Sequence, residues 1–187
     1  MRRARDRSYH RSMDLARQLV QIVDAAAAEA VRKGGAWVVC RPGCWQCCIG
    51  TFPISQADAR RLGEGLAELA ARDGERAARI QERAEAFLRL EEAGAADEAA
   101  CPALDPEAGT CDLYAWRPLT CRTFGPAVRW GGAGVGVCEL CFEGATEEEI
   151  AACAVELDTG ELEDAVEAEI EERTGVSGAT TVARALR

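Results

Sequence analysis

The chain has 187 residues, which is enough for one domain with a substantial hydrophobic core. Its net charge of −10 and pI near 4.8 argue against nucleic acid as a partner, because binding to phosphates requires clustered Lys and Arg. No apolar run is long enough to span a membrane and no export signal is visible, so we expect a cytoplasmic protein with reduced thiols and no membrane partner.

The N-terminal part predicts a basic, disordered tail over residues 1–12, followed by a single metal-binding domain over residues 13–175. A helix is predicted from residue 13 to about residue 33, since apolar residues recur at helical spacing and two glycines follow. These apolar residues are Leu15, Leu19, Ile22 and Ala26.

A helical hairpin is predicted over residues 55–92. Ser55, with Asp58 three residues later, has the pattern of a helix cap, and Asp73-Gly74 interrupts the helical pattern only briefly. The hairpin separates two cysteine-rich segments, residues 40–50 and residues 101–141. The second segment is rich in Gly and Pro and is expected to be irregular, apart from a short β-hairpin around residues 105–109.

Two further helices are predicted near the C-terminus. Thr146 is expected to cap the first, Asp158 is expected to cap the second, and Gly175 closes the second helix. Residues 176–187 are expected to form a tail. The predicted fold class is therefore mainly α, with helices around an irregular cysteine-rich centre.

The ten cysteines favour metal ligation over disulfides, because cytoplasmic thiols stay reduced and a disulfide within CWQCC would be strained. Two pairs of cysteines have C-x-x-C spacing, namely Cys44/Cys47 and Cys138/Cys141. This spacing lets a tight turn direct both sulfurs at one metal. Adjacent side chains diverge, so the Cys47-Cys48 pair is better suited to two metal centres, or to separate irons of one cluster. Nine candidate ligands result: Cys40, Cys44, Cys47, Cys48, Cys101, Cys111, Cys121, Cys138 and Cys141.

Nine thiolates exceed the four that one tetrahedral ion requires. Two zinc ions, three zinc ions with bridging thiolates, or a four-cysteine iron–sulfur cluster with further thiols would all satisfy this count. The tenth thiol, Cys153, lies within a predicted helix beside alanines and is interpreted as a small buried hydrophobe.

Cationic neighbours would offset the negative charge of a thiolate site. Arg117 and Arg122 flank Cys121 and are predicted to donate hydrogen bonds around the metal ligands, whereas Arg41 is equally compatible with an ordinary surface residue. His10, the only histidine, lies in the basic segment, so mixed Cys/His zinc ligation is not expected.

The stretches CRPGCWQCCIGTFPIS and CPALDPEAGTCDLYAWRPLTCRTFG resemble the CxxCxxCC zinc- or iron-chelating domain of YkgJ-type cysteine-cluster proteins. The resemblance covers about Cys40 to Cys141, although the first gap here is three residues instead of the two in the family's name. That difference affects which thiol takes which ligand role. The family pattern falls on Cys40, Cys44, Cys47, Cys48, Cys101, Cys111 and Cys121, whereas Cys138 and Cys141 are added from their spacing alone.

The expected function is the binding of metal ions through these thiolates, with an iron–sulfur cluster placed ahead of Zn²⁺ and a redox or metal-handling role. The resemblance extends to flagellin lysine-N-methylase, which implies a cluster-dependent enzyme as an alternative, although no S-adenosylmethionine motif is recognisable here. A structural zinc module for protein–protein interaction is the other alternative. An open coordination position would distinguish the enzyme from the structural module.

Overall fold

The computed structural model describes residues 2–132 and 134–187, with the backbone alone for residues 2–14. The chain divides into two compact units, and each is assembled from two separate stretches of sequence. Unit 1 comprises the residues up to Cys40 together with Arg122–Ser177, and unit 2 comprises Arg41–Cys121 and Gly178–Arg187. The predicted mainly α fold is confirmed, while the single domain over residues 13–175 stays a prediction.

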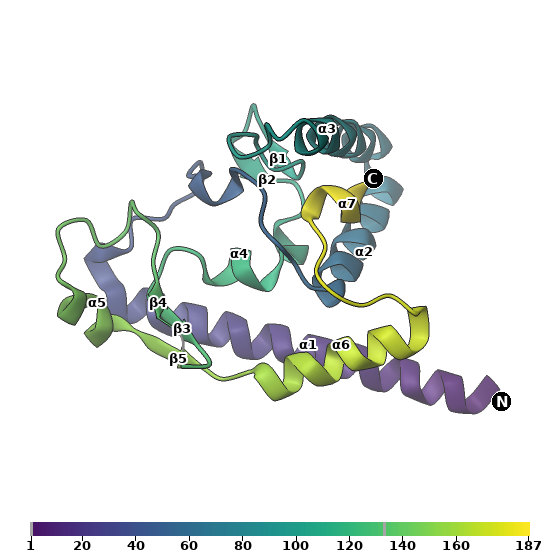
Figure 1. Cartoon of the computed structure of the whole chain (residues 1–187), viewed down its shortest axis with the longest axis horizontal. Helices are drawn as coiled ribbons and strands as arrows, with labels where there is room; N and C mark the ends of the chain where they lie inside the picture. Colours follow the sequence, from purple (N-terminus) through teal and green to yellow (C-terminus); the bar gives the residue numbers. More distant parts are fainter. Residues whose placement is uncertain (1, 133) are drawn as a thin grey trace. The chain divides into compact units, whose positions relative to one another are not determined.

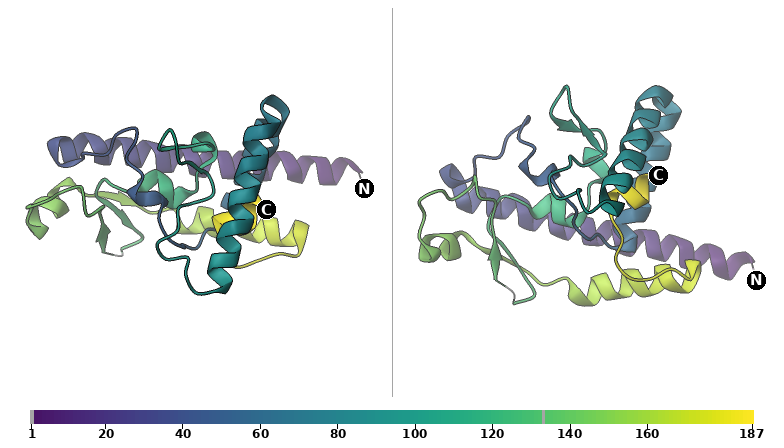
Figure 2. Two further views of the ribbon diagram at one scale, coloured as in Figure 1. Left: turned by 90° about the horizontal axis from the view of Figure 1, so that it is seen from above. Right: turned by 45° about the horizontal axis from the view of Figure 1, so that its top comes forward.

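Unit 1 is built on one long helix and a small sheet. Its elements are α1 (Arg2–Gly34), η1 (Gly35–Trp37), β3 (Val128–Trp130), β4 (Val135–Gly136), α5 (Glu147–Cys153), β5 (Val155–Leu157) and α6 (Gly160–Thr174). Helix α6 lies alongside α1 and runs in the opposite direction (Figures 1 and 2). The strand order is β4-β3-β5, with β3 antiparallel to β4 and parallel to β5. Strands of two or three residues show no usable alternation, so the sequence does not predict this sheet.

Helix α1 begins at Arg2, so residues 2–12 are helical where the sequence predicts a disordered tail. Among its described side chains, the buried apolar ones are Leu19, Val23, Ala27 and Ala30. The predicted apolar stripe coincides with this buried face only in part, because Ile22 belongs to the stripe but is 38% exposed. Apolar residues surround much of this helix, so the packing against its neighbours selects which of them are buried.

The caps of the two later helices follow the predictions in part. Thr146 and Glu149 form the reciprocal capping box at the start of α5, with N–H to side-chain oxygen distances of 2.8 and 3.2 Å. Helix α6 is preceded by Thr159 instead of Asp158, and Gly175 ends it in the left-handed conformation with φ 71°.

Unit 2 contains the predicted helical hairpin and the predicted β-hairpin. Its elements are η2 (Gln46–Cys48), α2 (Gln56–Arg72), α3 (Gly74–Glu92), β1 (Leu104–Asp105), β2 (Thr110–Cys111), η3 (Tyr114–Trp116) and α7 (Val182–Leu186). Helix α4 (Leu119–Thr123) spans the boundary between the units. Ser55 caps α2 by accepting from Asp58 N–H at 3.1 Å, and Asp73 caps α3 by accepting from Arg76 N–H at 3.0 Å.

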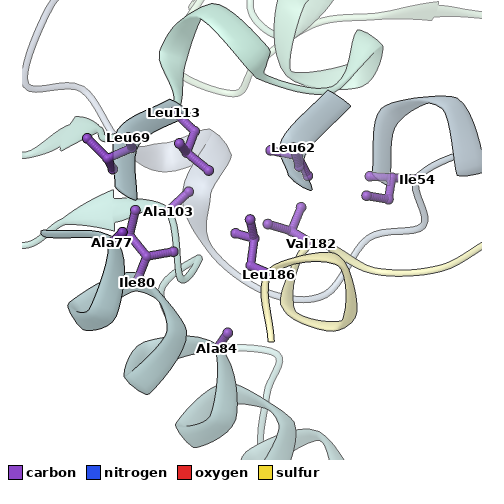
Figure 3. Packing of buried hydrophobic residues seen from close by; sticks show 10 residues of the cluster. All are labelled: Ile54, Leu62, Leu69, Ala77, Ile80, Ala84, Ala103, Leu113, Val182 and Leu186. Atoms are coloured by element: carbon purple, nitrogen blue, oxygen red, sulfur yellow. The ribbon is translucent and has the colours of Figure 1, made fainter. Parts of the chain in front are cut away.

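The core of unit 2 lies between α2, α3 and α7 (Figure 3). Leu62, Ile80 and Leu186 are almost fully buried there. The sequence predicts a tail over residues 176–187, whereas residues 182–186 form a helix packed in this core. A five-residue helix has too few turns to show a periodic pattern, and it is stable because it packs against neighbouring elements.

Along the part of the chain that the structure describes, no helix combines the length and the apolar character needed to cross a membrane.

Candidate metal centre

Unit 2 gathers five of the predicted ligand cysteines from separate stretches of the chain. They are Cys47 and Cys48 on η2, Cys101 before the β-hairpin, Cys111 on β2 and Cys121 on α4. We call these five residues the thiol cluster. Electrostatic interactions connect Cys47 with each of the other four.

Backbone pairing brings the first two segments of the thiol cluster together. Cys101 N–H donates to Cys48 C=O at 2.6 Å, and Gly50 N–H donates to Ala99 C=O at 2.9 Å. Cys111 follows through the β-hairpin, where it pairs with Leu104. Residues about fifty positions apart in sequence are therefore held together by main-chain hydrogen bonds between protein groups alone.

The segment leading to Cys121 is positioned by helix α2. Asp58 is buried, and its carboxylate accepts from Leu119 N–H at 3.2 and 3.1 Å, which fixes the first turn of α4. About two turns further along α2, a Cβ at Gly65 would lie 2.5 Å from Trp116 Cγ. Only glycine therefore allows Trp116 to pack against α2 as it does.

An ion-pair network around the buried carboxylate of Asp112 holds the two hairpins of unit 2 together. Asp112, whose side chain is 1% exposed, accepts from Arg76 Nε at 2.6 Å and from Arg83 Nη2 at 2.8 Å. Arg83 Nε also donates to Pro102 C=O at 2.8 Å. Helix α3 thus holds the residues directly after Cys101 and Cys111 in place.

Burial and hydrogen bonding give these thiols different acidities. The hydrogen bond between the Cys47 and Cys48 sulfurs, which lie 4.0 Å apart, lowers the pKa of Cys47 to about 6 and raises the pKa of Cys48. Burial raises the pKa of Cys101 to about 12, and burial likewise raises the pKa values of Cys111 and Cys121. One thiolate therefore lies among protonated thiols near neutral pH.

Arg117 lies close enough to the thiol cluster to act on its charge. Its guanidinium stacks over the Tyr114 ring at 3.9 Å and Nη1 donates to Tyr114 C=O at 3.0 Å. Its positive charge contributes to lowering the pKa values of Cys47 and Cys111. The other predicted donor, Arg122, directs Nη1 to both oxygens of Asp24 at 2.7 Å in unit 1, so its role near the metal ligands stays a prediction.

Three more of the predicted ligands lie in unit 1. Cys138 and Cys141 are buried at 5% and 4% exposure, whereas Cys40 is exposed. Burial raises the pKa of Cys141, although the backbone N–H groups of Val39 and Cys40 donate to its sulfur and oppose that change.

The remaining two cysteines have separate surroundings. Cys44 N–H donates to Arg41 C=O at 2.9 Å, and the neighbouring Gly43 lies against the turn of the β-hairpin at Gly109. Cys153 is half-buried at the end of α5, and its thiol donates to Lys33 C=O at 3.5 Å.

Within the described residues, no three Cys, His, Asp or Glu side chains lie close enough to hold a metal ion as they stand. The donor chemistry of the thiol cluster nevertheless fits thiophilic metals, because it offers five soft, partly buried sulfurs with a cation nearby.

Fold and site together define a mainly helical protein with cysteine thiols gathered by irregular backbone. The sequence profile of the family "CxxCxxCC: Putative zinc- or iron-chelating domain" matches residues 39–157, well over half of the chain. The chain therefore belongs to this family, in agreement with the resemblance seen in the sequence. No curated protein and no solved structure matches the chain significantly.

Sequence reasoning misses the positioning residues Arg76, Arg83 and Asp112. Two signals point to them: the arginines lie seven residues apart and so on one face of α3, and Asp112 directly follows a predicted ligand. Neither signal identifies the partner, because the pairing depends on how α3 packs against the β-hairpin.

Proposed function

We propose that this protein binds iron as an iron–sulfur cluster, or else zinc, through the thiol cluster, and acts in redox chemistry or metal handling. The observation that supports this most is the convergence of Cys47, Cys48, Cys101, Cys111 and Cys121 within unit 2. Membership of a family described as zinc- or iron-chelating supports the metal class.

The arrangement of Cys47 and Cys48 favours a centre with more than one metal ion. Their sulfurs lie 4.0 Å apart on adjacent residues, and five thiols exceed the four ligands of one tetrahedral ion. Cysteine thiolates are the usual ligands of iron–sulfur clusters, so we place iron ahead of zinc.

The chain's own residues would prepare such a site in three ways. Cys47 is ionised near neutral pH and is the first available metal ligand, while Cys101, Cys111 and Cys121 would release their protons as they bind. Arg117 would offset part of the accumulating negative charge. A bound iron–sulfur cluster would supply one-electron transfer.

The test is the content of iron, zinc and acid-labile sulfide in protein purified without oxygen, together with its visible spectrum. We expect metal in the wild type and in Cys153→Ser, with a clear loss in Cys101→Ser. Iron with sulfide and brown absorbance would support the cluster, and colourless protein with zinc would support the zinc form. Equal trace amounts of metal in all three proteins would contradict metal binding at the thiol cluster.

The same measurement tests the proposed part of Arg117. Arg117→Gln should retain less metal than the wild type after challenge with a chelator, because the thiolates would then repel one another more strongly. Arg60→Gln is the matched control, since Arg60 pairs with Glu64 on the surface of α2 at 3.1 Å. Equal retention by both variants would exclude a role for the Arg117 charge.

A further inference from the structure

Cys40, Cys138 and Cys141 surround one glycine in unit 1. A Cβ at Gly125 would lie 3.9 Å from Cys40 Cβ and 4.0 Å from Cys141 Sγ. The φ of Gly125 is 115°, which side chains rarely allow, and its carbonyl accepts from Cys138 N–H at 3.4 Å. The backbone conformation therefore requires glycine here, and the cysteine side chains lie at ordinary contact distance from it.

The C-x-x-C segment forms a tight turn that directs two sulfurs toward one another. Cys141 N–H donates to Cys138 C=O at 2.9 Å, and the two thiols are hydrogen-bonded. Phe142 then takes φ 60°, the only positive φ of a non-glycine residue in the described part of the chain. Such backbone strain is uncommon for a bulky residue and is typical of functional positions.

A second segment of the chain, residues 37–40, packs against this turn. Its backbone N–H groups donate hydrogen bonds to the sulfur of Cys141. Phe142 N–H donates to Trp37 C=O at 3.0 Å, and the two rings stack with centroids 6.3 Å apart. This contact places Val39 and Cys40 so that their N–H groups donate to Cys141 Sγ. Backbone N–H···S hydrogen bonds stabilise a thiolate over a thiol, and metal-bound sulfurs commonly receive them.

We propose that Cys40, Cys138 and Cys141 form a separate metal site in unit 1, in which three thiolates bind one zinc-type ion and solvent occupies the fourth position. This inference rests on the proposed function, since it requires a metal-binding protein, but it assigns Cys40 to a different centre from Cys47 and Cys48. Three protein ligands and one exchangeable position are the pattern of reactive zinc sites, whereas structural sites have four protein ligands.

The proposed site has two buried ligands and one exposed ligand, so one side of the ion would be open to solvent. Cys138 and Cys141 lie in the core of unit 1 with Ala127 and Phe142, so two ligands are held rigidly. Cys40 is exposed, and its side chain can change rotamer to complete the site without repacking the core. The exposed side is also where a solvent molecule or another small donor would reach the ion.

The experiment is a titration of the metal-free, reduced full-length chain with Co²⁺, whose thiolate charge-transfer absorbance reports each bound ion. We expect Cys40→Ser, Cys138→Ser and Cys141→Ser each to lose the same single binding step, about one ion per chain, and to keep the other steps. The double variant Cys40→Ser/Cys141→Ser should lose no more than either single variant. Cys101→Ser should keep this step and lose binding elsewhere.

Cys153→Ser is the matched control, because Cys153 lies in unit 1 but donates to Lys33 C=O. If Cys153→Ser also loses this binding step, Cys153 is a fourth ligand and the ion has no open coordination position. If Cys40→Ser loses the same binding steps as Cys101→Ser, Cys40 belongs to the thiol cluster and the separate site is refuted. The separate site is also refuted if the wild type binds Co²⁺ and Cys40→Ser loses no step. Both results leave the proposed function intact. A wild type that binds no Co²⁺ would overturn both. Circular dichroism checks the fold, and Cys40→Ser remains informative if the buried variants unfold.

Discussion

Among the thiols of unit 2, Cys47 and Cys101 have pKa values that are shifted in opposite directions. The hydrogen bond with Cys48 keeps the pKa of Cys47 low, at about 6, whereas burial raises the pKa of Cys101 to about 12. An unfolded cysteine titrates near 9, so the two residues have opposite effects on stability as the pH changes.

We therefore expect the unfolding free energy of the metal-free, reduced protein to peak near pH 9. Between pH 6 and 9 the folded state has released the Cys47 proton and the unfolded state has not, so stability rises with pH and is lost as the pH falls through about 6. Above pH 9 the unfolded state releases the Cys101 proton first, and stability falls by up to about 1.4 kcal/mol per pH unit for this thiol.

Urea unfolding between pH 6 and 10.5 measures both branches of this curve. Cys47→Ser should flatten the acidic branch, and Cys101→Ala should weaken the alkaline branch. A stability that keeps rising beyond pH 9.5 would contradict the buried, protonated state of Cys101.

At the scale of elements, helix α3 holds the β-hairpin through Asp112. The carboxylate is buried and receives Arg76 and Arg83 at 2.6 and 2.8 Å. Asp112→Ala would leave both guanidiniums without this partner, and they are only partly exposed. We expect the free energy of unfolding to fall by about 3 kcal/mol, as for other broken ion pairs with a buried member.

Glu68→Ala is the control for this prediction, because it breaks an exposed pair with Arg72 at 3.6 Å. Such pairs contribute about 0–1 kcal/mol, so the control should unfold close to the wild type in urea. Similar losses in both variants would show that the buried network has no special role in positioning the cysteine segments.

At the scale of the whole molecule, the helices and the first cysteine segment of unit 2 differ in what supports them. The helices of unit 2 surround an apolar core, whereas residues 41–50 are held by few backbone hydrogen bonds. Metal binding should therefore contribute most to the order of the cysteine segments, because ligation and folding are coupled there.

Chelation of the metal should increase amide hydrogen exchange in residues 41–50 much more than in α2 and α3. A ligand that binds only the folded state also stabilises it by about 2.7 kcal/mol at a hundredfold excess over Kd, so the melting temperature should fall as well. Readdition of the metal is the control and should restore both values. Unchanged exchange and unchanged melting after complete removal would refute this coupling.

The long helices and their caps were accessible from the sequence because their determinants are local. Ser55, Thr146 and Gly175 lie at helix ends with the predicted geometry, and the Asp73 break between α2 and α3 is as short as predicted. The three-stranded sheet of unit 1 and helix α7 escaped prediction because each segment is too short to show a period, and long-range packing stabilises it.

By itself, the sequence determined the mainly helical class, the thiol chemistry and the family, because helical periodicity and cysteine spacing are properties of neighbouring residues. The tertiary structure alone decided which cysteines lie together: Cys47, Cys48, Cys101, Cys111 and Cys121 in unit 2, and Cys40, Cys138 and Cys141 in unit 1. Contacts such as Cys101 N–H to Cys48 C=O join residues far apart in the chain, and no local pattern specifies such pairings.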